Sequence, residues 1–109
     1  NAPGLNLHRA VYCARNFEYY SEDSMLTNIL GKAVCQGAQS KGLMAAVKHF
    51  AYNHQETNRS GMSVFFTEQA ARENELRGFQ GAMAENIAGG AMTAFNRVGV
   101  DILVPAGIF

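Results

Sequence analysis

The chain has 109 residues, with nine basic and nine acidic side chains, so its formal net charge is zero. A neutral chain lacks the basic surface that attracts nucleic acid or an anionic membrane, and no run of Lys or Arg supplies one locally. No apolar run approaches the roughly 20 residues that a membrane-spanning helix needs. We therefore expect no nucleic-acid partner and no membrane partner. The hydrophobic share of 48 % is ordinary for a globular core.

The start of the chain and its two cysteines give little information about its cellular compartment. The sequence begins with Asn1 and shows no signal-peptide pattern, so it resembles an internal piece of a longer protein. Cys13 and Cys35 are too few to indicate a disulfide framework. We expect both to be free, partly buried thiols.

The first forty residues predict a strand, a loop and a helix. A Pro3-Gly4 turn precedes alternating residues at 5–8 (LNLH), which is typical of a strand, and residues 13–23 have the composition of a loop. Ser21 or Asp23 can cap a helix that runs to about Ser40. One apolar stripe of this helix consists of Leu26, Ile29, Leu30, Ala33 and Val34.

The remainder predicts a second strand at 44–50, a long loop at 51–66, a second helix from Thr67 to Gly89-Gly90, and a third strand at 91–95. The second helix has one apolar face, and its charged residues fall largely outside that face. The apolar residues are Leu76, Phe79, Met83 and Ile87, and the charged ones are Arg72, Glu73, Glu75 and Arg77. The order strand, helix, strand, helix, strand predicts an α/β fold with three parallel strands and right-handed crossovers.

Polar residues follow or end all three predicted strands, and parallel strands place such groups on one rim. They are Asn6 and His8 with the following Arg15, then Lys48 and His49, then Asn96. Cationic and amide donors without a glycine-rich phosphate loop suit a neutral polyhydroxylated ligand such as a sugar. Lys48 and His49 could instead be a solvated strand end, Arg15 and Glu18 a structural ion pair, and Tyr19 and Tyr20 packing residues.

The segment His54-Gln55-Glu56 raises the question of a metal site. No second His or Cys stands at a ligand spacing, so we expect no metal and no cofactor. Ser60 and Ser63 lie in no nucleophile-elbow sequence.

Several segments, in order along the chain, resemble one known family. They are LNLHR (5–9), ARNFEYYSED (14–23), GAQSKG (37–42), VKHFAYNHQETNR (47–59), EQAARENELRGF (68–79) and AMTAFNRVG (91–99). Together they resemble the N-terminal barrel domain of glycoside hydrolase family 3, of the β-glucosidase type. The resemblance implies that residues 1–109 are part of a (β/α)8 TIM-type barrel domain and that the whole enzyme is a retaining β-glycosidase.

The resemblance also implies roles for particular residues. Arg15, Lys48 and His49 match residues that bind hydroxyls of the sugar, and the Lys48–His49 peptide bond is expected to be cis in an intact homologue. Met92 aligns with a methionine of the family on the next strand. Phe95 stands where a tyrosine often lies near the nucleophile, and it lacks that hydroxyl. The expected partner is a small carbohydrate substrate.

The loop after Lys48-His49 favours one branch of the family. Bacterial N-acetylglucosaminidases carry a KHFPGHG-like segment, whereas this chain reads KHFAYNHQE. The resemblance therefore favours terminal β-D-glucosyl or xylosyl residues as substrate.

The catalytic residues of the family have no match in the chain. Its nucleophile is an Asp in a Ser-Asp or Thr-Asp pair, which does not occur here. Residues 99–107 (GVDILVPAG), including Asp101, instead resemble a segment that follows the nucleophile strand, so residues 99–109 could be joined from later in the barrel. We expect the isolated chain to be inactive and to need the rest of the barrel and a second domain.

Two alternatives belong to other classes of protein. One is a non-catalytic carbohydrate-binding domain that keeps Arg15, Lys48 and His49. The other is an α/β barrel enzyme acting on phosphorylated ligands, against which the lack of a glycine-rich loop before either helix counts.

Overall fold

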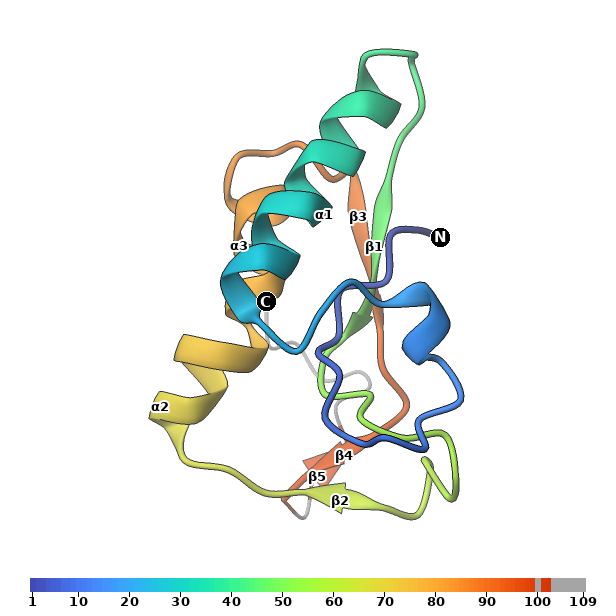
Figure 1. Cartoon of the computed structure of the whole chain (residues 1–109), viewed down its shortest axis with the longest axis vertical. Helices are drawn as coiled ribbons and strands as arrows, with labels where there is room; N and C mark the ends of the chain where they lie inside the picture. The colour runs from blue at the N-terminus through green and yellow to red at the C-terminus, as the bar shows by residue number, and fades with distance from the viewer. Residues whose placement is uncertain (100, 103–109) are drawn as a thin grey trace.

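The structure is a computed structural model that describes residues 1–99 and the backbone of residues 101–102. Its elements are η1 (Asn16–Glu18), α1 (Ser24–Gln39), β1 (Ala46–Phe50), β2 (Ser63–Val64), α2 (Glu68–Ala70), η2 (Ala71–Glu75), α3 (Arg77–Ala84), β3 (Gly90–Thr93), β4 (Arg97–Val98) and β5 (Asp101–Ile102). β1 and β3 pair in parallel, and α1 packs beside α3 on one side of this pair (Figure 1). The fold is therefore α/β with parallel strands, as the sequence predicts.

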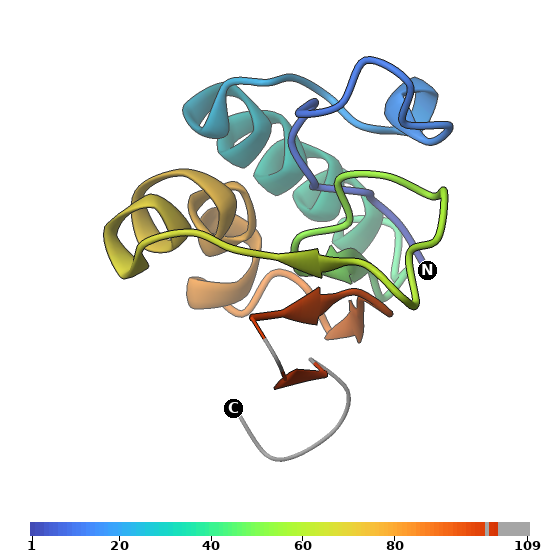
Figure 2. The ribbon, with the colours of Figure 1, turned by 90° about the horizontal axis from the view of Figure 1, so that it is seen from below.

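A second sheet, made of three short strands, was not predicted. β2 pairs in parallel with β4, which pairs antiparallel with β5 (Figure 2). The prediction of an uninterrupted loop over 51–66 is therefore wrong at Ser63–Val64, where two residues are too short a run to show an alternating pattern. The segment 99–109 was expected to be joined from later in the barrel, and its residues 100 and 103–109 lie outside the described residues.

The predicted first strand at 5–8 is also wrong, although the N-terminal segment does lie beside β1. The bridges are at Ala2 and Gly4 instead, and Leu5 N–H donates to the Lys48 carbonyl at 2.6 Å. Beyond that point the side chain of Asn6 bonds the backbone N–H and C=O of His49, at 2.8 and 2.9 Å. These are the groups that a continuing ladder would use, so the strand pairing stops there.

Helix α1 begins where the sequence predicts, because a carboxylate oxygen of Asp23 accepts from the Leu26 N–H at 2.6 Å. Its inward face, however, is not the predicted apolar stripe, whose large members Leu26, Ile29, Leu30 and Val34 are exposed. The buried residues are Thr27, Gly31 and Cys35. A Cβ at Gly31 would lie 2.5 Å from Leu5 Cδ2, so the close approach of the N-terminal segment requires small residues on this face. Cys13 and Cys35 are free, as predicted, and both are buried.

The predicted second helix begins at its expected cap but is not continuous. Thr67 Oγ1 accepts from Ala70 N–H at 3.1 Å, and a π-helical turn, η2, separates α2 from α3. The predicted apolar face does point inward, since Phe79 and Ile87 are buried and Leu76 and Met83 pack against the core. The helix ends at Ala84 rather than at Gly89-Gly90, because Asn86 takes a positive φ of 53° that ends a helix.

Glu75, predicted to lie outside the buried face, is itself buried because it stands in the π turn. Its two carboxylate oxygens each meet one partner at 2.9 Å, Arg9 Nε and His54 Nε2. Burial alone would raise the pKa of Glu75, but its hydrogen bonds and electrostatic attraction to His54 and Arg9 hold that pKa below its usual value. The carboxylate ties the N-terminal segment and the loop after β1 to the helical layer.

Replacing Glu75 with Gln should lower the free energy of unfolding by about 2 kcal/mol, because an uncharged amide cannot replace two charge-assisted hydrogen bonds. Thermal unfolding of the folded protein that carries this chain measures the change. Glu73→Gln is the matched control: Glu73 is exposed, and its change should stay within about 0.5 kcal/mol. An equal effect of both variants would contradict this role for Glu75.

Candidate functional site

Of the polar residues expected at one rim, Arg15, Lys48 and His49 lie together at the carboxyl end of β1, whereas Asn96 is fully buried. Three segments form this rim: residues 9–20 with the short helix η1, the end of β1 with the loop that follows it, and the turn that follows β3 (Figure 1). The parallel pairing of β1 with β3 brings the last two together, since Lys48 stands opposite Met92 and Phe50 opposite Thr93. Residues 9–20 reach the rim because the N-terminal segment that precedes them bridges to β1 at Ala2 and Gly4.

A carboxylate, Glu18, joins two of the predicted site residues. One of its oxygens pairs with Arg15 Nε and the other with Lys48 Nζ at 3.0 Å. All three side chains keep partial exposure, between 16 % and 25 %. Burial alone would raise the pKa of Glu18, but the hydrogen bonds from Lys48 and Arg15 hold it below its usual value. The predicted ion pair of Arg15 and Glu18 thus exists, and it also positions Lys48.

The third predicted residue, His49, is held through both its backbone and its ring. Asn6 bonds its backbone N–H and C=O, and the hydroxyl of Tyr19 lies 3.1 Å from its Nδ1. Burial, together with the positive charges of Arg15 and Lys48, lowers the pKa of His49 to about 4. The imidazole is therefore neutral at pH 7. The Lys48–His49 peptide bond is cis.

A second carboxylate, Glu56, organises the loop after β1. Its Oε1 accepts from Asn53 Nδ2 at 2.9 Å and its Oε2 from Arg59 Nη1 at 2.7 Å. The guanidinium carbon of Arg59 lies 5.0 Å from the centre of the Phe95 ring, within the range of a cation–π contact. Arg15 Nη1 lies 3.9 Å from Glu56 Oε1, so the two carboxylate clusters are neighbours.

The structure thus connects four of the five predicted site residues. Arg15, Lys48 and His49 meet through Glu18 and Tyr19, and Phe95, half exposed, joins through Arg59. Met92 is placed beside Lys48 by strand register. Among the connecting residues, sequence reasoning placed Asn6 on the rim, gave Glu18 an ion pair with Arg15 and gave Tyr19 a packing role. It assigned no role to Asn53, Glu56 and Arg59. The three-residue spacings of Arg15 with Glu18 and of Glu56 with Arg59 are the available signal, since such spacing suits local ion pairs.

The stability conferred by the neutral His49 should depend on pH. In the unfolded chain this residue takes up a proton near its ordinary pKa of 6.5, whereas in the folded chain it does so only near pH 4. Between these values the unfolded state binds more protons, so stability should fall as the pH falls. From pH 7 to pH 5 the loss due to His49 should be about 2 kcal/mol.

Thermal unfolding at pH 7 and pH 5 of wild type and His49→Gln checks this. The glutamine variant should be less sensitive to the change in pH by about that amount. An identical pH dependence in both proteins would show that His49 titrates in the folded state as it does in the unfolded state.

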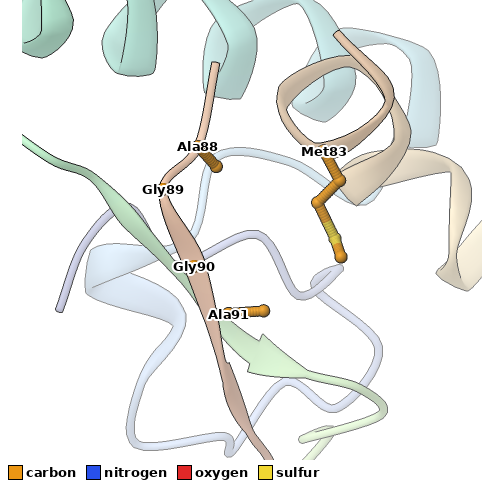
Figure 3. Close-up of a pocket in the computed structure, with 5 residues that line it drawn as sticks. All are labelled: Met83, Ala88, Gly89, Gly90 and Ala91. Atoms are coloured by element: carbon orange, nitrogen blue, oxygen red, sulfur yellow. The ribbon is translucent and has the colours of Figure 1, made fainter. Parts of the chain in front are cut away.

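A cavity of about 330 Å³ lies at the other end of β3 and does not belong to this cluster. Figure 3 shows Met83 and Ala91 on its wall, with Ala88, Gly89 and Gly90 completing the lining. Its lining residues carry no ionisable or hydrogen-bonding side chain, so it offers no chemistry comparable to that of the rim.

Within residues 1–99, no three His, Cys, Asp or Glu side chains gather as metal ligands would. His54 instead bonds Glu75, away from Glu56. No helix in the described part of the chain is long and apolar enough to cross a membrane.

The fold and the rim define an α/β protein with a dense polar cluster at the carboxyl ends of parallel strands, the place where such folds hold small ligands. The family model "Glycosyl hydrolase family 3 N terminal domain" matches residues 1–106. The chain therefore belongs to glycosyl hydrolase family 3. The relatives and solved structures that it resembles are β-glucosidases, the type that the sequence predicts.

Named relatives agree with this assignment. The chain is 42 % identical over 96 residues to a β-glucosidase of Ruminococcus albus and 41 % identical over 96 residues to β-glucosidase A of Butyrivibrio fibrisolvens. These matches cover 88 % of this chain but only 10 % and 12 % of the relatives. The solved structure of β-glucosidase 3B from Thermotoga neapolitana in complex with glucose superposes with a TM-score of 0.88 at 42 % identity, covering 93 % of this chain and 14 % of that one. The chain thus spans about a tenth of the curated relatives that it matches.

Proposed function

We propose that this chain is part of the N-terminal (β/α)8 barrel domain of a retaining β-glycosidase, and that its rim binds the terminal β-D-glucosyl residue of the substrate. The observation that carries the proposal is the cluster of Arg15, Lys48 and His49 around Glu18 and Tyr19. Membership of the family supports the reaction class.

The chemistry of the cluster suits a neutral sugar. Glu18 neutralises one of the two positive charges of Arg15 and Lys48 while leaving them N–H groups to donate, and all three side chains remain partly exposed. The neutral ring of His49 adds no charge at pH 7. Hydrogen bonds between a charged donor and a sugar hydroxyl contribute about 1.5–3 kcal/mol each. Phe95 and Met92 would add apolar contact on the side of β3.

The reacting carboxylates are proposed to come from elsewhere in the intact protein. A retaining mechanism needs a nucleophile and an acid/base about 5–5.5 Å apart. Glu18 and Glu56 are both engaged in ion pairs, so we assign neither to catalysis. This engagement also favours a second candidate function, a non-catalytic carbohydrate-binding domain derived from such a barrel.

Calorimetric titration with glucose tests the binding proposal. The intact protein that carries this chain should release heat with glucose, and a parallel titration with xylose establishes which of the two sugars it prefers. Galactose, the C4 epimer of glucose, serves as the matched ligand control. The absence of heat with any of these sugars, from a protein shown to be folded, would refute a sugar-binding rim. Binding without hydrolysis of an aryl glucoside would favour the second candidate.

The origin of residues 99–109 remains a separate proposal. We propose that this tail is joined to the third strand from a later barrel segment. Such a junction implies that the nucleophile strand was deleted between Gly99 and Asp101. A related sequence with an uninterrupted nucleophile strand between the residues that match Gly99 and Asp101 would support this deletion. A related sequence with the same spacing between those two residues as this chain would count against it.

A further inference from the structure

Three hydrogen bonds connect Glu56 to His49 through Asn53 and Tyr19. Asn53 Nδ2 lies 2.9 Å from Glu56 Oε1 and 2.9 Å from the hydroxyl oxygen of Tyr19. A carboxylate that is ionised can only accept, so the amide nitrogen rather than the amide oxygen of Asn53 must face Glu56. The second N–H of the same nitrogen then donates to Tyr19.

Tyr19 can in turn donate a hydrogen bond to the imidazole of His49. Because its oxygen already accepts from Asn53, its own hydrogen is free to point at His49 Nδ1, 3.1 Å away. Tyr19 is 6 % exposed and Asn53 is 2 % exposed, so the contact is buried. Burial raises the pKa of Tyr19 well above its usual value, which keeps the hydroxyl protonated.

In this arrangement the ring of His49 accepts a hydrogen bond at Nδ1. A neutral imidazole that accepts at one nitrogen carries its proton on the other. Within residues 1–99, Nε2 has no hydrogen-bond partner, so its N–H is available to a ligand.

We propose that Tyr19, oriented by Asn53 and Glu56, is a positioning residue that fixes His49 as the Nε2–H tautomer, so that this ring donates to an oxygen of the bound sugar. The inference rests on the proposed function for the identity of the ligand, but the tautomer itself does not depend on it. Lys48 and Arg15 can also only donate, so the rim is a set of donors that matches the acceptor oxygens of a sugar.

A neutron crystal structure of the intact protein that carries this chain tests the tautomer directly. We expect deuterium on Nε2 of His49 and the O–D bond of Tyr19 directed at Nδ1. Deuterium on Nδ1 would overturn the inference, whether or not glucose binds. Deuterium on Nε2 in a protein that binds no glucose would instead leave the tautomer standing and refute the proposed function.

Tyr19→Phe separates a positioning role from a merely structural one. The variant removes only the hydroxyl, and the affinity for glucose should fall about 10-fold or more. In protein labelled with ¹⁵N-histidine, the ring nitrogens of His49 should then report a mixture of tautomers. Weakened binding with the proton still entirely on Nε2 would mean that Tyr19 acts through packing alone, and would overturn the inference.

Tyr20→Phe is the matched control. It makes the same chemical change at the next residue, where the hydroxyl has no hydrogen-bond partner within the described part of the chain. Glucose affinity and the His49 signals should be those of wild type. An equal change in both variants would also contradict the proposed role of Tyr19.

Discussion

On its own, the 109-residue chain should hydrolyse an aryl β-D-glucoside no faster than the uncatalysed reaction. Hydrolysis with retention requires one ionised carboxylate free to attack the sugar and one carboxylic acid able to protonate the leaving group. Glu18 is committed to Arg15 and Lys48, whose hydrogen bonds keep its pKa low, so it is a poor proton donor. Glu56 accepts from Asn53 and Arg59.

Release of p-nitrophenol from its β-D-glucoside measures this activity, and enzymes of ordinary efficiency exceed the uncatalysed rate by at least 10⁶-fold. The intact protein that carries the chain is the positive control and should be active. Turnover by the isolated chain that is lost in Glu18→Gln or Glu56→Gln would show that a carboxylate of the rim is catalytic after all.

Replacing Lys48 with Met in the intact protein should weaken glucose binding roughly 10- to 100-fold, which is the loss of one charge-assisted hydrogen bond. Methionine keeps most of the length and the apolar stem of lysine but cannot donate. The change also removes one partner of Glu18, so Arg15 would be held less firmly. Calorimetric titration with glucose measures the affinity.

Lys41→Met provides the control for this experiment, because Lys41 is exposed in the turn between α1 and β1, away from the rim. Its affinity should equal that of wild type. If Lys48→Met bound glucose as tightly as Lys41→Met, Lys48 would be a solvated strand end, which is the alternative interpretation of the sequence.

The sequence predicted the elements that depend on local signals. Asp23 and Thr67 cap their helices because a short side-chain oxygen can satisfy free N–H groups wherever it stands. The strands around Val47 and Met92 were found because apolar runs bounded by polar residues suit a buried parallel strand. The placement of Arg15, Lys48 and His49 on one rim followed from parallel topology, while their roles came from the resemblance to the family.

What was missed depends on contacts between distant segments. The inward face of α1 is set by the approach of Leu5 to Gly31, which no periodicity in the helix reveals. The π turn that buries Glu75 is stabilised by the hydrogen bonds of its carboxylate to His54 and Arg9, which are 21 and 66 residues away in the chain. No pattern of single residues could indicate those pairings.

Contacts between distant segments also explain why the hydrogen-bonding role of Tyr19 was not predicted. Tyr19 has a packing role in the sequence interpretation, and it is indeed buried, but its hydroxyl lies between Asn53 and His49. Tyr19 precedes α1 in the sequence, whereas both partners follow it. Aromatic residues in a loop therefore predicted burial correctly and gave no indication of the hydrogen bonds.

A crystal structure of the intact protein with bound glucose tests directly whether Arg15, Lys48 and His49 hold the sugar. We predict sugar oxygens within about 3 Å of Lys48 Nζ and His49 Nε2, with the guanidinium of Arg15 in reach of a further hydroxyl. Glucose bound elsewhere, with water alone against these three side chains at a saturating sugar concentration, would show that they do not hold the sugar.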